Sequence, residues 1–182
     1  MRELALNVLD IAENSVTAHA TEIDIDIRVE KNILSIVIKD NGCGMTEEFV
    51  KKVVDPFSTT RTTRKVGMGI PLFKLASEAA GGKFDIRSKS GIGTTVTATF
   101  EIDNIDRAPL GNIASTISQL IATSPEIRFV FNYSIEGNGF SVDTDEVKEN
   151  IGDVPITEYE ILKFIEEMIN ENMTALNGGI DL

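Results

Sequence analysis

Cysteine is nearly absent from this chain of 182 residues, and the single Cys43 cannot form an internal disulfide. A lone cysteine fits a reducing compartment. No apolar run approaches the roughly 20 residues that are needed to span a membrane. Acidic residues appear early, at Glu3 and Asp10, so the N-terminal segment is not a signal peptide. These absences make a cytoplasmic protein with no membrane contact the expected class.

Positive charge is also scarce, and it is unevenly distributed. Seventeen Lys and Arg residues face 29 Asp and Glu residues, which gives a net charge of -12. Residues 1–104 carry 13 basic and 15 acidic residues, whereas residues 105–182 carry 4 and 14. Such a surface repels phosphate backbones, so we expect no nucleic-acid partner. The asymmetry suggests two parts, and a hydrophobic content of 42% allows a packed core.

Hydrophobic periodicity predicts an α+β fold, a two-layer sandwich with helices on one face of a mainly antiparallel sheet. The first domain, residues 1–104, combines hairpins with interspersed helices, and residues 105–182 form a small α-β-β-α extension. In the first domain we expect helices at 2–19, 46–53 and 70–80 and strands at 22–30, 33–40, 83–89 and 93–102. In the extension we expect helices at 110–123 and 157–175 and strands at 126–136 and 140–142.

The first helix carries a narrow polar stripe. On a helical wheel Glu3, Asn7, Asp10, Asn14 and Thr17 share one line, opposite the apolar residues. Such a stripe is often only a solvent-facing side. The alternative is a site, because an Asn carbonyl oxygen suits a hard cation such as Mg²⁺, and Asp10 one turn away could polarise a water.

The segment "DNGCGM", residues 40–45, ends the second strand. An ordinary turn explains it. Alternatively, the segment forms the floor of a ligand pocket, in which Asp40 could accept a hydrogen bond from an exocyclic amine. Gly42 and Gly44 would let a flat ring approach the backbone, and Met45 could pack on the ring face.

The segment "DPFSTTRTTRKVGMGIPL", residues 55–72, gathers positive charge in an acidic chain. A basic surface loop is one explanation. The other is an anion site, because the glycine turn at Gly67 and Gly69 opens a helix whose N-terminus presents free N–H groups. Arg61, Arg64 and Lys65 would supply charge for a triphosphate. The hydroxyl donors nearby are Ser58, Thr59, Thr60, Thr62 and Thr63.

The three segments just described, and a fourth at Gly91–Thr95, follow one another along the chain. Their residues Asn14, Asp40, Gly67 and Gly91 are separated by 26, 27 and 24 residues. The order resembles the GHKL superfamily of ATP-binding domains, the Bergerat fold, which includes DNA gyrase, heat-shock chaperones, sensor histidine kinases and mismatch-repair ATPases. "LDIAENSVTAHA" looks like its N box, "DNGCGM" and "GMGIPL" its glycine boxes, and "GIGTT" the last motif. "DPFSTTR" is similar to the segment before the second glycine box in histidine kinases. The resemblance covers residues 1–104.

The resemblance implies an ATP site with Mg²⁺. Asn14 would coordinate the Mg²⁺ that bridges the phosphates, and Asp40 would read the adenine amino group. Asp10 holds the position of the water-activating base, usually Glu in the ATPase members, and its shorter side chain puts efficient hydrolysis in doubt. Further expected contacts are Gly42, Gly44, Met45 and Thr95 around the base, and Thr59, Thr60, Arg61, Arg64, Lys65, Gly67, Met68 and Gly69 in the lid over the phosphates.

The reaction stays open at this level. The only histidine, His19, ends the N-box helix, and we expect no phosphoacceptor helix because there is no room for one before residue 1. One hypothesis is an ATP-dependent protein kinase, similar to the small serine kinases, in which Asp10 assists the acceptor group of a partner protein. The alternatives are an ATP-gated binding switch, in which ATP orders a lid at 57–69, and a slow ATPase.

The acidic extension contains no cluster of metal ligands and no nucleophile–base pair. Its structural interpretation is that it extends the sheet and covers a face. Its functional alternative is an acidic docking surface or a homodimer interface.

Overall fold

The computed structural model describes residues 3–55 and 68–182. In chain order its elements are α1 (Leu4–Thr17), β1 (Glu22–Glu30), β2 (Ile33–Asp40), α2 (Glu47–Val53), α3 (Gly69–Ala79), β3 (Phe84–Lys89), β4 (Gly93–Glu101), α4 (Ile113–Thr123), β5 (Arg128–Ile135), β6 (Asn138–Asp143), α5 (Thr144–Ile151) and α6 (Tyr159–Asn177). Each expected helix and strand lies within a few residues of one of these elements.

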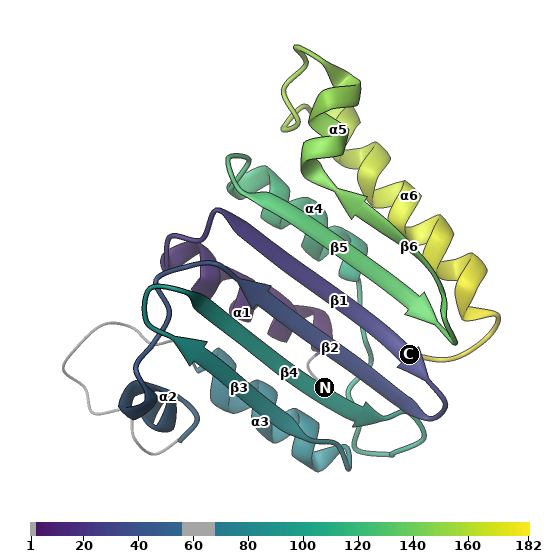
Figure 1. Cartoon of the computed structure of the whole chain (residues 1–182). Helices are drawn as coiled ribbons and strands as arrows, with labels where there is room; N and C mark the ends of the chain where they lie inside the picture. Colours follow the sequence, from purple (N-terminus) through teal and green to yellow (C-terminus); the bar gives the residue numbers. More distant parts are fainter. Residues whose placement is uncertain (1–2, 56–67) are drawn as a thin grey trace.

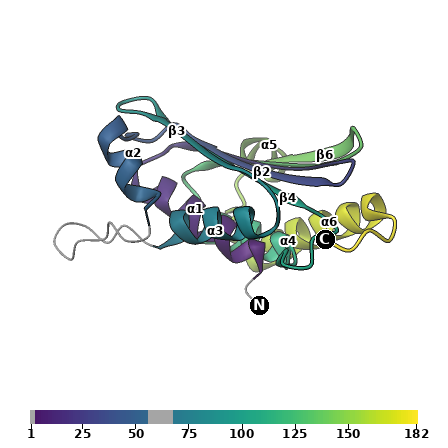
Figure 2. The ribbon, with the colours of Figure 1, turned by 90° about the horizontal axis from the view of Figure 1, so that it is seen from below.

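The strands form one sheet in the order β3-β4-β2-β1-β5-β6. Neighbouring strands run antiparallel except for β1 and β5, which are parallel. Helices α1, α3, α4 and α6 lie together on one side of the sheet, as the view from below shows (Figure 2). The other face carries no helical layer in the described part of the chain (Figure 1). The predicted α+β sandwich, with helices on one face of a mainly antiparallel sheet, is therefore confirmed.

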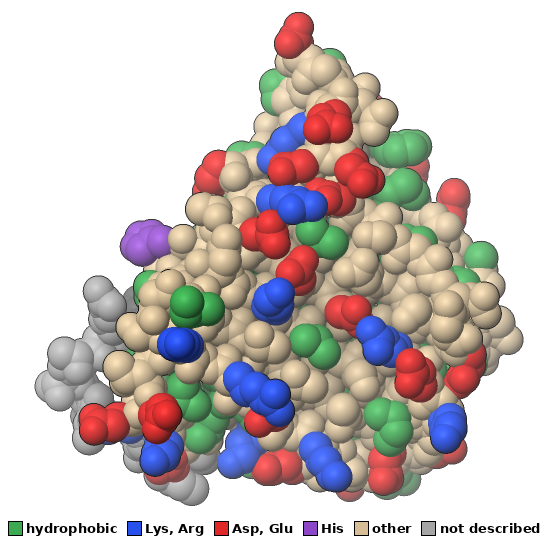
Figure 3. Space-filling model, viewed as in Figure 1, with side chains coloured by type: hydrophobic (Ala, Val, Ile, Leu, Met, Phe, Trp, Pro, Cys, Tyr) green, Lys and Arg blue, Asp and Glu red, His purple; other side chains and the backbone are tan. Residues whose placement is uncertain are grey.

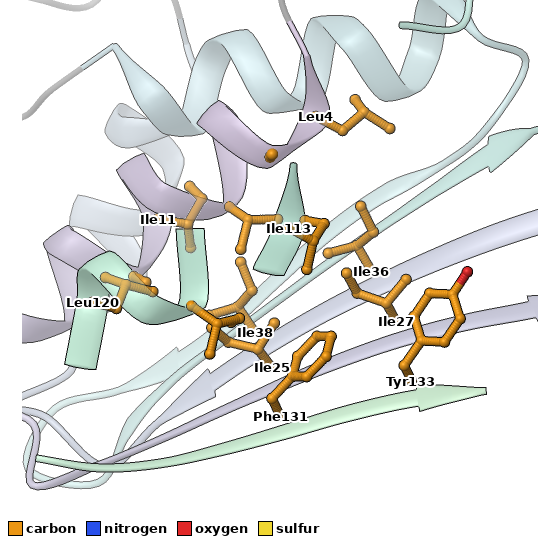
Figure 4. Packing of buried hydrophobic residues seen from close by; sticks show 14 of the residues in the cluster. Leu4, Ile11, Ile25, Ile27, Ile36, Ile38, Ile113, Leu120, Phe131 and Tyr133 are labelled. Carbon is orange, nitrogen blue, oxygen red and sulfur yellow. The ribbon is translucent and has the colours of Figure 1, made fainter. Parts of the chain in front are cut away.

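Alternation of side chains along each strand builds the core. In β1 the residues Ile23, Ile25, Ile27 and Val29 are at most 1% exposed, while the charged residues between them face the other side. Leu4, Ile11 and Leu120 of the helices belong to the same buried cluster as these strand residues (Figure 4). Burying one such aliphatic side chain stabilises the fold by about 2 kcal/mol, so a one-residue slip of β1 would be strongly unfavourable.

The acidic extension continues the same sheet. Strand β5 pairs with all of β1 except Glu30, from Glu22 with Arg128 to Val29 with Ile135, and β6 pairs with β5. Phe129, Phe131 and Tyr133 join one hydrophobic cluster with the residues of the first domain. The structural interpretation of the extension therefore agrees with the fold, while the division into domains at residue 104 stays a prediction.

The extension has one more helix than the expected α-β-β-α order. Helix α5 follows β6 directly, and Asp143 caps it by accepting a hydrogen bond from the Asp145 N–H at 2.9 Å. Sequence periodicity missed this helix because its residues are mostly charged or polar and only Thr144 is buried. A cap and helix propensity, rather than an apolar face, define such a helix.

Candidate functional site

The polar stripe of α1 is only partly open to solvent. Asp10 is exposed and Asn14 is half-buried, whereas Asn7, on the same line, is only 8% exposed. Helix α1 packs against both α3 and α4. The opposite face of α1 is buried against the sheet through Leu4, Val8, Ile11 and Ala12. The helical wheel therefore predicted the buried face correctly, and Asp10 and Asn14 remain on the accessible side.

Asp40 is held by three hydrogen bonds at the end of β2. Its Oδ1 accepts from the backbone N–H of Gly42 at 2.9 Å and of Thr94 at 3.2 Å. Its Oδ2 accepts from the Ser15 hydroxyl at 2.6 Å, and Asp40 itself is only 9% exposed. Since Ser15 directly follows Asn14, this short bond ties the N box to the strand-end carboxylate.

Sequence analysis did not single out Ser15. It lies on the apolar arc of α1, between the positions of Ile11 and Ala12, and is 3% exposed. A hydroxyl at a core-facing position needs a hydrogen-bond partner, since burying a polar group without one is costly. That mismatch between residue type and position was the available signal.

The glycines of the first box are explained by close backbone packing. A β-carbon on Gly42 would lie 2.8 Å from the Ala18 carbonyl oxygen, which accepts a hydrogen bond from the Cys43 N–H. Gly44 has φ +63°, and a β-carbon there would lie 2.0 Å from the Lys89 carbonyl oxygen. The space beside both Cα atoms is thus filled by α1 and by the β3–β4 hairpin. Their expected contacts with a ring stay a prediction.

Met45 and the last motif complete this end of the sheet. The backbone N–H of Met45 donates to Ser88 Oγ at 2.8 Å, and the Met45 side chain packs half-buried against the core. Ser88 Oγ also lies 2.8 Å from Thr94 Oγ1 and donates to the Gly93 carbonyl at 3.0 Å. The first glycine box and the "GIGTT" motif, far apart in the sequence, are therefore joined by hydrogen bonds.

The structure sets Thr94 rather than Thr95 beside Asp40, and the expected contact of Thr95 with the base stays a prediction. Thr94 is the residue that pairs with Asp40 in the β2–β4 register and donates to its carboxylate. Successive side chains of a strand point to opposite faces, so Thr95 lies on the open face, paired with Lys39 and Arg87. The sequence shows two adjacent threonines, and only the register decides which one faces the helices.

The N-terminus of α3 lies beside Asp10. Gly69 is buried, and a β-carbon placed on it would lie 2.9 Å from the Asp10 Cβ. Met68, the preceding residue, is 56% exposed. The first turn of a helix leaves N–H groups without intrahelical partners and carries partial positive charge. The structure therefore brings the second glycine box and the carboxylate of the N box together.

Several expected contacts lie outside the described residues: Thr59, Thr60, Arg61, Arg64, Lys65 and Gly67. Their roles stay predictions.

A shallow hollow of about 320 Å³ lies on the open face of the sheet. Its lining includes Asp24, Lys39, Arg87 and Thr95, which share one cross-strand row. This is the face toward the viewer in Figure 3. Burial and the neighbouring Glu22 carboxylate raise the pKa of Asp24. Asp40 and Thr94 also border the hollow at the strand ends. The row itself lies on the face of the sheet opposite α1, so we do not assign the hollow to the site of Asp10 and Asn14.

Two negative findings apply to residues 3–55 and 68–182. No group of three or more His, Cys, Asp and Glu side chains there could hold a metal ion. No helix in these ranges has the length and apolar character that crossing a bilayer requires.

The first part of the chain matches a known family model. The model for "Histidine kinase-, DNA gyrase B-, and HSP90-like ATPase" matches residues 1–104, more than half of the chain. A putative sensor protein of Shewanella frigidimarina is 30% identical over 107 residues, which are 58% of this chain and 16% of that protein. A putative NtrY-like sensor histidine kinase of Rickettsia conorii is 25% identical, over 58% of this chain and 18% of its own. The match thus spans less than a fifth of either relative.

A solved structure shares the fold. The N-terminal domain of a DNA repair protein aligns with a TM-score of 0.52 and 18% identity, over 79% of this chain and 52% of that chain. The alignment covers more of this chain than the family match does, so the shared fold includes part of the acidic extension.

Proposed function

This chain belongs to the family of histidine kinase-, DNA gyrase B- and HSP90-like ATPases, and on that premise we propose that it binds a magnesium–adenine nucleotide beside α1. The adenine amino group donates to Asp40, Asn14 ligates the Mg²⁺, and the phosphates lie at the N-terminus of α3. The bound nucleotide supplies a transferable phosphoryl group, and the metal neutralises its charge.

The observation that carries this proposal is the hydrogen bond between Ser15 and Asp40. It fixes the strand-end carboxylate against the helix that also carries Asp10 and Asn14. Because Gly69 lies close to Asp10, the N-terminus of α3 lies beside the face of α1 that carries Asp10 and Asn14. Three of the four sequence boxes thus meet along α1, and the fourth meets Asp40 through the Thr94 N–H.

The hydrogen bonding of Asp40 fits an adenine amino group. A carboxylate offers about four acceptor positions, and the Gly42, Thr94 and Ser15 donors use three of them. The remaining position can accept one N–H. Guanine carries a keto oxygen at that position, and neither this oxygen nor the Asp40 carboxylate has a proton to donate. The site therefore favours adenine.

Asp10 is the group that we assign to the chemistry. It is exposed beside the N-terminus of α3, where it can accept a proton from an attacking hydroxyl, imidazole or water. We propose transfer to a partner protein, which makes the chain a stand-alone kinase-like regulator. The second candidate is an ATP-gated switch or slow ATPase, which the short side chain of Asp10 favours, since it reaches one methylene less far from α1 than Glu does.

Calorimetric titration with ATP, with and without Mg²⁺, tests the binding. We expect Mg²⁺-dependent binding that Asn14→Ala abolishes while the fold is kept, and that Asn150→Ala, an exposed amide on α5, leaves unchanged. ATP should bind more tightly than GTP, and Asp40→Asn should reduce that preference. Equal ATP and GTP affinity in the unaltered protein would refute the role of Asp40.

Labelled ATP with cell extract then separates the two candidates. Transfer of label to a protein, lost in Asp10→Asn and kept in Glu13→Gln on the same helix, supports the kinase. Tight binding without transfer supports the switch, and slow phosphate release that requires Asp10 supports the ATPase.

A further inference from the structure

Strand β6 forms one edge of the sheet and has an unused side. It pairs with β5 alone, and within the described ranges its other side forms no backbone hydrogen bond. Asn138, Gly139 and Ser141 are exposed. A row of unpaired N–H and C=O groups on an edge strand can pair with another strand.

The hairpin geometry identifies the backbone groups that point outward. Glu136 and Gly137, with φ of 49° and 81°, form a two-residue loop closed by the hydrogen-bonded pair of Ile135 and Asn138. Hydrogen-bonded and non-bonded pairs alternate along an antiparallel ladder. The N–H and C=O groups of Gly139 and Ser141 therefore point away from β5, as does the N–H of Asp143. The Asp143 carbonyl is the N-cap carbonyl of α5 and accepts the first hydrogen bond within that helix.

Helix α6 runs beside this edge and carries exposed apolar side chains. One side of α6 faces inward, because Ile165, Ile169 and Met173 are buried and Tyr133 of β5 donates to Asn177. The opposite flank carries Phe164, which is 64% exposed, together with the half-buried Ile161 and Met168. Figure 1 shows α6 running beside β6 at the border of the molecule.

We propose that β6 pairs antiparallel with β6 of a second copy of this chain, about a two-fold axis at Ser141. Ser141 then exchanges N–H and C=O hydrogen bonds with Ser141 of the second copy, and the Asp143 N–H of each copy donates to the Gly139 carbonyl of the other. The two copies form one continuous twelve-stranded sheet, and the Phe164 flanks of the two α6 helices meet beneath it.

The edge is complementary to itself, which is why a second copy is the occupant. Such a two-fold interface places the same patch on both subunits. In this register Asp143 faces Gly139, so no like charges oppose each other across the strands. On the helical face Phe140 lies opposite Val142, an apolar cross-strand pair. Asp143 is also ion-paired with Arg128, and this hydrogen bond lowers the pKa of Asp143.

The net charge of -12 on each copy opposes association. Added salt screens this repulsion, so the dimer should tighten between about 50 and 300 mM NaCl, where the Debye length falls well below about 15 Å. An assembly held by ion pairs between copies would weaken instead. The direction of the salt effect therefore distinguishes strand pairing from charge pairing.

Sedimentation of the full chain over a range of concentrations tests the proposal. We expect a dimer whose dissociation constant rises at least about tenfold in Ser141→Pro, since proline removes an outward N–H without touching the β5 ladder. Ser141→Ala keeps the N–H and should keep the dimer. Phe164→Glu should weaken it similarly, whereas Ile105→Glu, at a 93% exposed residue elsewhere, adds the same charge and should act only through repulsion.

A disulfide tests the register. With Cys43→Ser as background, Ser141→Cys should form a covalent dimer on diamide oxidation, because directly paired residues bring their Cα atoms within the range of a disulfide. Ser134→Cys, one strand inward, should not. A monomeric unaltered chain, or a dimer insensitive to both Ser141→Pro and Phe164→Glu, would overturn the proposal.

Discussion

Replacing Ser15 by alanine removes the hydroxyl that donates to Asp40 Oδ2 at 2.6 Å. Both residues are buried, at 3% and 9% exposed. A hydrogen bond to a charged group contributes about 1.5–3 kcal/mol, and the lost oxygen leaves little cavity. Asp40 keeps its two backbone donors, so its own position is only partly released. We therefore expect Ser15→Ala to lower the free energy of unfolding by about 2 kcal/mol, which lowers Tm by about 4–8 °C for a chain of this size.

Urea unfolding and calorimetry measure the loss, with Ser118→Ala as the matched control. Ser118 is also buried, at 8% exposed, but its hydroxyl donates to a neutral carbonyl at 3.5 Å, so its loss should cost well under about 1 kcal/mol. In an Asp40→Asn background the Ser15→Ala cost should shrink, since the acceptor is neutral. Equal costs for Ser15→Ala and Ser118→Ala, or an unchanged cost in that background, would show that the bond does not hold Asp40.

Three further outcomes are expected. Burial raises the pKa of Tyr133 to about 12, so the folded state favours the neutral hydroxyl. The resulting stabilisation is complete below the unfolded pKa of about 10 and is lost as pH rises through about 12. Tyr133→Phe should therefore reduce the pH dependence of the urea unfolding midpoint between about pH 9 and 11.5. Thr94→Val keeps the backbone N–H that donates to Asp40 and removes only Oγ1, which lies 2.8 Å from Ser88 Oγ. It should weaken ATP binding by at most about tenfold in calorimetry, an effect of about 1.4 kcal/mol, whereas Thr95→Val on the open face should leave binding within about twofold. A larger effect of Thr95→Val than of Thr94→Val would contradict the register argument. Gly44→Ala should destabilise the fold by more than about 3 kcal/mol in thermal unfolding, because left-handed backbone strain and a clash with backbone atoms add together. Gly91→Ala has the same type of strain, at φ +78°, but nothing lies within 4 Å of the new β-carbon, so it should cost only about 1–2 kcal/mol.

Much of the fold could be predicted because burial follows periodicity. In β1 every second residue is an aliphatic one, and each lies in the core. Periodicity failed to predict an element that lacks an apolar face. Helix α5 has mostly polar residues and begins at the Asp143 cap, so periodicity gave no signal for it. The parallel pairing of β1 with β5 joins residues about a hundred positions apart, a contact that no local pattern encodes.

The candidate site likewise has residues that the sequence predicted and residues that it did not. Asn14, Asp40 and Gly69 were predicted from motif order, because their residue types and spacing suffice to suggest chemistry. The partners of Asp40 were not, since Ser15 and Thr94 reach it only through the packing of α1 and the register of β4.

The amino-acid order by itself determined the strand faces, the glycine turns and the choice of residues that we propose for nucleotide binding, since these depend on side-chain chemistry and short-range geometry. Tertiary structure alone decided which of two adjacent threonines meets Asp40, that the acidic extension continues the sheet, and that β6 ends the sheet with one side unpaired among the described residues. Those facts depend on register and on contacts between distant segments, where a shift of one residue reverses the face that a side chain occupies.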